Sequence, residues 1–92
     1  MALLNDSEVE ERLSRLDGWD RAGDAIEKSF RRGDFVGAVE FVQSLVAPAE
    51  GMNHHPDVAI SWETVTVTIS THSEGGLTAA DFELATKIDA LG

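Results

Sequence analysis

The chain has 92 residues, of which 42% are hydrophobic and 26% charged, so we expect one globular domain, residues 1–92, with a thin core. Seven lysines and arginines stand against seventeen acidic residues, which gives a formal net charge of −10. A surface this acidic repels phosphate backbones, so direct nucleic-acid binding is not expected. Cysteine is absent, which excludes disulfides, thiolate metal sites and a cysteine nucleophile.

The hydropathy of the chain predicts a cytoplasmic protein. Its first residues lack the basic and apolar regions of a signal peptide, and no apolar run approaches the ~20 residues of a transmembrane helix. Secreted domains of this size usually carry disulfides. We therefore expect a soluble protein in a reducing compartment, with no membrane partner.

The first segment, residues 6–17, predicts a helix because apolar residues recur at helical spacing, namely Val9, Leu13 and Leu16. We expect Asp6 or Ser7 to cap its first turn and Gly18 to end it. Residues 19–32 then predict a hairpin that turns at residues 22–24. Its second strand alternates, with three residues on one face: Ile26, Lys28 and Phe30.

A second helix is predicted from Asp34, its N-cap, because apolar residues recur at spacings of four, three and four. These residues, expected to face the core, are Phe35, Val39, Val42 and Val46. Pro48 should distort the last turn, because it lacks an N–H and biases Ala47 away from helical backbone angles. A loop rich in turn formers follows, residues 50–57.

Two strands are predicted next, at residues 58–60 and 64–72. The second alternates strictly and places the apolar residues on one face, namely Val65, Val67 and Ile69. The opposite face carries Thr64, Thr66, Thr68, Ser70 and His72. A turn at residues 73–76 leads to a last helix that opens with a capping box of Thr78 and Asp81. That helix should bury Phe82, Ala85 and Ile88.

The order α-β-β-α-β-β-α with local hairpins predicts an α+β fold, in which a four-stranded antiparallel sheet has helices packed on one face. The other face meets solvent or another subunit. Three helices cannot cover the edges of such a sheet, and unpaired edges invite pairing with another copy. We therefore expect a homo-oligomer.

The three histidines fall in two places, His54 and His55 in a loop and His72 after the long strand. Histidine can give or take a proton near neutral pH, so these residues are candidates for acid–base catalysis. They could equally be polar surface. A metal site is less favoured, because adjacent residues of extended chain point to opposite faces and no His-x-x-x-His pair occurs.

Other side chains also have two interpretations. Glu50 could be a catalytic carboxylate or the last polar residue of a helix, and Asp81 could be catalytic or only a capping residue. Trp19 and Trp62 could anchor the core or an interface, or wall a site for a flat heterocycle. No phosphate-binding loop or nucleophile elbow occurs.

One spacing connects these residues: Glu50-x-x-x-His54-His55-Pro56, then Trp62, His72 and Gly76-Leu77-Thr78-x-x-Asp81. This string resembles the signature of the pterin-4a-carbinolamine dehydratases, and the resemblance extends upstream through Gly18-Trp19 and Asp34-Phe35. Departures include Trp62-Glu63, Arg31-Arg32-Gly33 and Pro48, which affect helix geometry and substrate preference but remove no signature histidine.

The resemblance implies a lyase without cofactor or metal, acting in tetrahydrobiopterin recycling. Its substrate would be a 4a-hydroxytetrahydropterin and its product a quinonoid dihydropterin. An aromatic amino acid hydroxylase would be a functional partner, coupled through the free pterin, and the subunits would form dimers or tetramers. The alternative is a non-catalytic interaction or assembly-chaperone protein on the same fold.

The resemblance also implies roles for individual residues. His55 and His72 would carry out acid–base work, and His54 would mainly bind the pterin. Glu50 would hold one imidazole in the required tautomer, with Asp81 in support. The substrate-binding residues would be Asn53, Pro56, Ser70, Thr71, Ser73 and Trp19.

Overall fold

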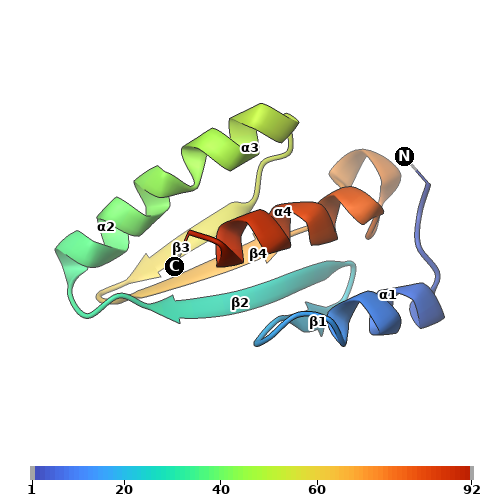
Figure 1. Ribbon diagram of the computed structural model, residues 1–92, viewed down its shortest axis with the longest axis horizontal. Coiled ribbons are helices and arrows are strands. Elements are labelled where there is room, and N and C mark those ends of the chain that lie inside the picture. The colour runs from blue at the N-terminus through green and yellow to red at the C-terminus, as the bar shows by residue number, and fades with distance from the viewer. Residues whose placement is uncertain (1, 92) are drawn as a thin grey trace.

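The computed structural model describes residues 2–91. In chain order the elements are α1 (Asp6–Leu13), β1 (Asp20–Ala22), β2 (Ala25–Arg31), α2 (Phe35–Ser44), α3 (Val46–Met52), β3 (Asp57–Ser61), β4 (Thr64–Ile69), the 3-10 helix η1 (His72–Glu74) and α4 (Ala79–Asp89). Figure 1 shows α4 crossing over the sheet, with α2 and α3 on one side of it and α1 near the other end.

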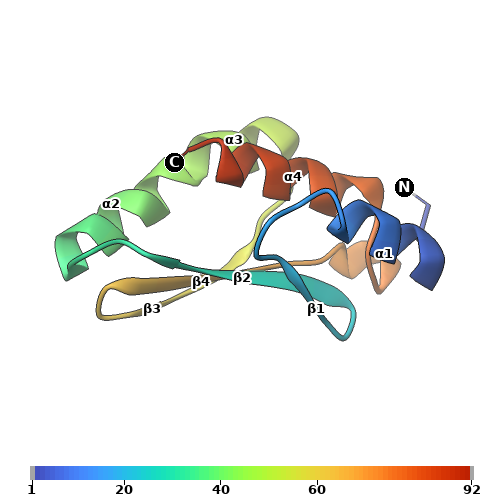
Figure 2. The same cartoon turned by 60° about the horizontal axis from the view of Figure 1, so that its bottom comes forward.

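The strands form one antiparallel sheet in the order β1-β2-β4-β3. The helices gather on one face of this sheet and leave the other face bare (Figure 2). The predicted α+β architecture and its element order are therefore confirmed. Within residues 2–91, no helix is long and apolar enough to cross a membrane.

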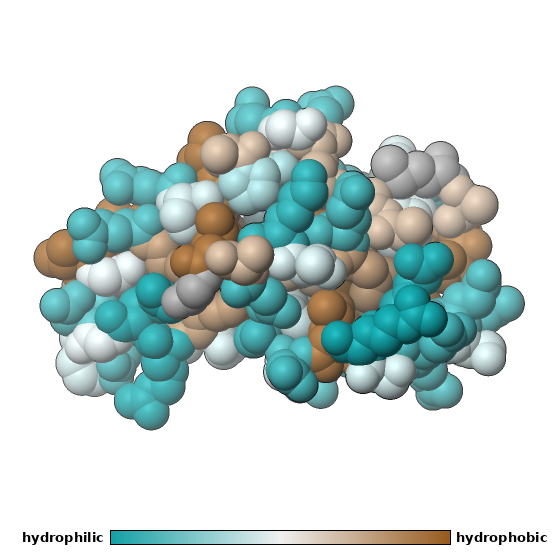
Figure 3. Space-filling model, in the orientation of Figure 1, coloured by the Kyte–Doolittle hydropathy of each residue, from teal (hydrophilic) through white to brown (hydrophobic). Residues whose placement is uncertain are grey.

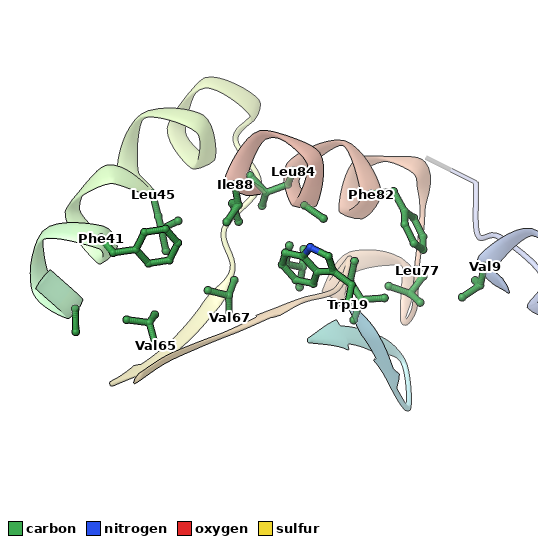
Figure 4. Close-up of a cluster of buried hydrophobic side chains, with 14 residues drawn as sticks. Val9, Trp19, Phe41, Leu45, Val65, Val67, Leu77, Phe82, Leu84 and Ile88 are labelled. Carbon is green, nitrogen blue, oxygen red and sulfur yellow. The ribbon is translucent and has the colours of Figure 1, made fainter. Parts of the chain in front are cut away.

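The core lies between this sheet and the helices (Figure 4). As predicted, β4 buries Val65, Val67 and Ile69 completely, while its threonines stay on the other face. The last helix contributes Phe82, Leu84, Ala85 and Ile88. The predicted capping box at its start is also confirmed, with Thr78 as N-cap and Asp81 as its partner.

The first helix begins and ends differently from the prediction. Its N-cap is Asn5, which forms a capping box with Glu8, so neither Asp6 nor Ser7 is the cap. The pattern of Asn followed three residues later by Glu is a recognised helix start. Helical structure ends at Leu13 and the chain continues through turns to Gly18, whose φ of +80° suits glycine in a turn rather than at the helix end.

The buried face of α2 is rotated from the predicted one. Phe35 and Val46 are exposed, and the buried positions are Ala38, Phe41, Leu45 and Ala49. Both sets follow the same helical spacing, because this segment is apolar on most of its circumference. The period therefore predicted a helix correctly but could not decide which side faces the core.

The predicted distortion near Pro48 is confirmed. The helix is interrupted at Leu45, whose N–H bonds the carbonyl of Val42 rather than that of Phe41, at 3.1 Å. Pro48 is the third residue of the new helix α3, where a backbone N–H has no partner within the helix in any case. Ala47 nevertheless lies inside α3, so the expected bias away from helical structure is wrong there.

Candidate active site

The site begins at the C-terminus of α3, where Asn53 adopts left-handed backbone angles, φ 49° and ψ 45°. Its N–H donates to the carbonyl of Glu50 at 3.1 Å, and the N–H of His54 donates to that of Ala49 at 3.0 Å. These two bonds are the Schellman motif that ends many helices. This turn directs the chain from α3 back towards the start of α4.

His54 is held there by a buried carboxylate. Its Nε2 lies 2.6 Å from Oδ1 of Asp81, and the side chains are 12% and 0% exposed. The other oxygen, Oδ2, accepts hydrogen bonds from the Thr71 hydroxyl at 2.9 Å and from the Thr78 N–H at 2.8 Å. Because a carboxylate accepts hydrogen bonds, the imidazole is the donor in this pair.

Asp81 therefore connects two segments that are distant in the sequence. One oxygen holds His54, the neighbour of His55, and the other holds Thr71, the neighbour of His72. The Thr71 hydroxyl also contacts the Thr78 hydroxyl at 2.9 Å and is buried. Thr71 was predicted at the pocket rim. Its hydroxyl is instead hydrogen-bonded to Asp81 and Thr78 in the interior, where it helps to hold the turn that carries His72.

His55 has a partner of a different kind. Its Nε2 contacts Oε2 of Glu50, five residues earlier, and both side chains are more than half exposed. Beside this pair lies a hollow of about 200 Å³ with mostly apolar walls from α2, α3 and β3. Pro56, half-buried, lines the same hollow.

His72 lies outside the strand in which it was predicted. Strand β4 ends at Ile69, because the chain turns into η1, where the N–H of Glu74 bonds the carbonyl of Thr71 at 3.0 Å. The Nε2 of His72 lies 3.8 Å from Oδ2 of Asp57, and both side chains are 74% exposed. Ser70 is half-buried between β4 and η1, and Ser73 is exposed within η1.

Trp19 does not join the histidines. It is 5% exposed, packs edge-on against Phe30, and donates its indole N–H to Asp89. Asp89 follows Asp81 by eight residues on α4, a distance of about 12 Å along a helix. Trp19 is thus a core residue (Figure 4), as one of the two interpretations of its sequence position predicted, and it lies away from the three histidines.

One carboxylate beside the histidines, and one pairing, escaped the sequence analysis. Asp57 carries no sequence signal beyond its position after Pro56. Asp81 was recognised through its capping box, but its bond to His54 spans 27 residues and leaves no trace in local spacing. Only the fold brings these groups together.

The result is a set of three imidazoles, each next to a carboxylate. A carboxylate partner orients the ring and fixes which nitrogen carries the proton, which prepares a histidine for proton transfer. Across residues 2–91, no three histidine or acidic side chains are grouped as a metal site requires.

The fold and this site define a class of small α+β proteins whose site is built from carboxylate-paired histidines. The family model for pterin 4 alpha carbinolamine dehydratase matches residues 2–91, and the chain belongs to that family.

Similar proteins extend over nearly the full length. A relative from Roseiflexus castenholzii, provisionally named a pterin-4-alpha-carbinolamine dehydratase, is 50% identical, with 98% of this chain and 97% of the relative covered. One from Thermosynechococcus vestitus, with the same provisional name, is 46% identical, with 96% and 93% covered.

Two solved structures are also similar. A transcriptional coactivator/pterin dehydratase from Brucella melitensis has a TM-score of 0.92 and 38% identity, with 98% of each chain covered. A pterin dehydratase-like protein described as a RuBisCO assembly factor in the alpha-carboxysome has a TM-score of 0.67 and 25% identity, with 80% of this chain and 88% of that chain covered.

Proposed function

We propose that this protein is a hydro-lyase that converts a 4a-hydroxytetrahydropterin to the quinonoid dihydropterin, in tetrahydrobiopterin recycling. The bond between C4a and the hydroxyl oxygen breaks, and a protonated histidine supplies the proton with which the oxygen leaves as water. A neutral histidine removes the proton from N5, and a double bond forms between C4a and N5. The reaction is redox-neutral, so neither a cofactor nor a metal is required.

The observation that carries this proposal is the buried link through Asp81, which holds the His54–His55 turn and the Thr71–His72 turn in a fixed relation. General acid–base catalysis needs an acid and a base that are held within reach of the atoms that exchange protons. We assign acid–base work to His55 and His72, whose rings are exposed to an incoming substrate. His54, whose Nε2 is bound to Asp81, would contribute to pterin binding rather than to proton transfer.

The surrounding residues have supporting roles in this proposal. Glu50 would set the tautomer of His55, since it contacts the Nε2 of that ring. Pro56 and the adjoining hollow would offer the pterin an apolar edge. Asn53, Ser70 and Ser73 would form the polar rim, whereas Thr71 and Asp81 would act from beneath the site.

The test is an assay with chemically generated 4a-carbinolamine, whose decay is followed by its absorbance. The purified protein should accelerate the decay, and prior treatment with a chelator should leave that activity unchanged. If the chelator abolishes activity and zinc restores it, a metal mechanism replaces the histidine mechanism. If decay is not accelerated, the dehydratase proposal is wrong.

A second candidate function is a non-catalytic assembly role, favoured by the likeness to the protein described as a RuBisCO assembly factor. The presence of His54, His55 and His72 together favours the dehydratase. A protein inactive on the carbinolamine yet able to promote assembly of a partner complex would support the second candidate.

We also propose that the protein self-associates as a dimer or tetramer in the cytoplasm, with functional coupling to an aromatic amino acid hydroxylase through the free pterin. All five residues of β3 are exposed, and β3 is an edge strand with free backbone groups along one side. Light scattering at micromolar concentration should show a mass above the 9.9 kDa of one chain. A stable monomer would contradict this proposal.

A further inference from the structure

The basic side chains of this acidic protein are concentrated along one groove. Two adjoining cavities, of about 570 and 490 Å³, lie between α4 and the end of α1, and they share Arg15, Leu16 and Thr86. We call them together the α1–α4 groove. Four of the seven basic residues of the chain line it, namely Arg12, Arg15, Lys28 and Arg32.

Acidic residues are scarce in the same place. Of the seventeen in the chain, three line the groove: Asp17, Glu83 and Asp89. Asp89 is already engaged, because it accepts hydrogen bonds from Trp19 and from Lys28, the latter at 2.9 Å. The groove therefore carries one more cation than it carries acidic residues, on a chain whose net charge is −10, and it favours an anionic partner more than the acidic remainder of the surface does.

Arg12 is the cation most available to such a partner. It is half-buried at the groove, and within residues 2–91 no hydrogen bond or ion pair reaches its guanidinium. By contrast, Arg15 pairs with Glu11 and Arg21 pairs with Asp6. A half-buried guanidinium without a partner gains most from a carboxylate that arrives from outside.

The floor of the groove is apolar. Leu16 and Phe82 line the larger cavity and Phe30 the smaller one. In Figure 3 the region between α4 and α1 shows brown apolar atoms bordered by teal polar side chains. An apolar floor with charged margins is the usual anatomy of a protein-binding surface.

We propose that the α1–α4 groove binds an extended segment of a partner protein in which acidic side chains alternate with apolar ones. The two cavities lie end to end at shared lining residues, and each alone is within the ~300–1,000 Å³ range of a small-ligand pocket. Together they therefore suit an elongated chain better than one compact molecule. The acidic side chains would bind Arg12 and its neighbours, and the apolar ones would cover Leu16 and Phe82. No histidine lines the groove, so this site is independent of the dehydration chemistry.

The test is selection from a phage library of random 12-residue peptides on the intact protein. Selected peptides should be enriched in both acidic and apolar residues, and synthetic copies should bind in solution, as measured by fluorescence anisotropy. Arg12→Glu should weaken this binding by about tenfold or more, and so should Thr86→Trp, which fills the junction of the two cavities without changing charge.

The matched control is Arg31→Glu, which makes the same change of charge outside the groove. Arg31 is exposed and pairs with Glu63 at 2.9 Å, and that pairing raises the pKa of its guanidinium. Its substitution should alter peptide binding by less than about twofold, since distant surface charges are largely screened by salt. Circular dichroism of all three variants verifies that they fold.

Three outcomes would overturn the proposal. Selected peptides could lack acidic enrichment, they could bind Arg12→Glu as well as the wild type, or no peptide could be selected while Arg12→Glu changes the mass of the oligomer. The last result would make the groove an interface between copies of this chain. None of these outcomes depends on carbinolamine turnover, so they are distinct from a failure of the proposed function.

Discussion

The neighbours His54 and His55 lie in very different surroundings, although one peptide bond joins them. His54 is almost enclosed and its partner Asp81 is fully buried, with further bonds to Thr71 and Thr78. His55 and its partner Glu50 are both more than half exposed, and Glu50 belongs to the same short stretch of chain. The first pair is part of the fold, whereas the second is available to a ligand.

In the proposed function, one turn would serve stability and chemistry at once. The buried pair fixes the backbone of the turn, because Asp81 cannot be left unpaired in the interior without a large cost. His55 inherits that fixed position without being buried itself. His72 gains the same benefit from Thr71. The backbone of each exposed histidine is therefore held in place by its buried neighbour, while the carboxylate beside it orients the ring.

The largest effect that we predict follows from this division. His55→Ala and His72→Ala should each lower the rate of carbinolamine dehydration by roughly 10²–10⁴-fold, the usual contribution of one acid–base group. The free energy of unfolding should change by less than about 1 kcal/mol, because exposed ion pairs contribute little. Stopped-flow absorbance and urea titration measure the two quantities.

Near-normal turnover in both of these variants would show that the histidines are not the catalysts. A large loss of stability would instead break the contrast, since His55 or His72 would then be part of the fold.

The next effect concerns stability. Asp81→Ala removes the acceptor of three hydrogen bonds and leaves His54 and Thr71 without their partner, so the free energy of unfolding should fall by about 3 kcal/mol. Glu50→Ala is the matched control in the exposed pair, with an expected loss below about 1 kcal/mol. Urea unfolding monitored by tryptophan fluorescence compares them. Equal losses would mean that the two pairs do not differ as described.

Much of this arrangement was open to prediction from the sequence. The alternation of Val65, Val67 and Ile69 indicated the central strand and its inner face, and Asp34 and Thr78 marked helix starts. These are local signals, because the spacing of residues along the chain is enough to predict the strand and the helix starts. The family resemblance indicated that the three histidines are candidate site residues.

The errors came from features that spacing does not determine. The buried side of α2 depends on which part of a mostly apolar helix meets the sheet, and Phe35 proved to be exposed. For Trp19 the sequence left a core role and a site role open, and its place just before β1, with its indole against Asp89 of α4, decides for the core. The bond between His54 and Asp81 depends on how a loop and a distant helix meet, which only tertiary structure decides.

A smaller effect is expected at Asn53, the turn residue that directs His54 inward. A left-handed backbone costs a residue with a Cβ about 1–2 kcal/mol, and asparagine tolerates it better than most. Asn53→Ala should therefore lower the free energy of unfolding by about 1 kcal/mol, while Asn53→Gly should leave it unchanged or raise it slightly.

Thermal unfolding of these two variants separates the effect of the backbone from that of the side chain. If Asn53 also binds substrate, both should raise KM, because both lack the amide. A variant pair with equal stability would show that the turn does not need a left-handed residue.

The smallest effect is expected at Pro48, which bears on how α3 presents Glu50 and the histidines. The proline occupies the first turn of α3, where it forfeits no helical hydrogen bond and restricts the unfolded chain. Pro48→Ala should therefore lower the free energy of unfolding by about 0.5 kcal/mol. Gly51→Ala is the matched control, because its added Cβ meets no atom within 4 Å and should stabilise the same helix by about 0.5–1 kcal/mol. Urea titrations of both variants give the signs. If Pro48→Ala were more stable than the wild type, the proline would be straining a helix that otherwise continues unbroken from α2. The interruption at Leu45 would then position Glu50 at a cost to the free energy of unfolding.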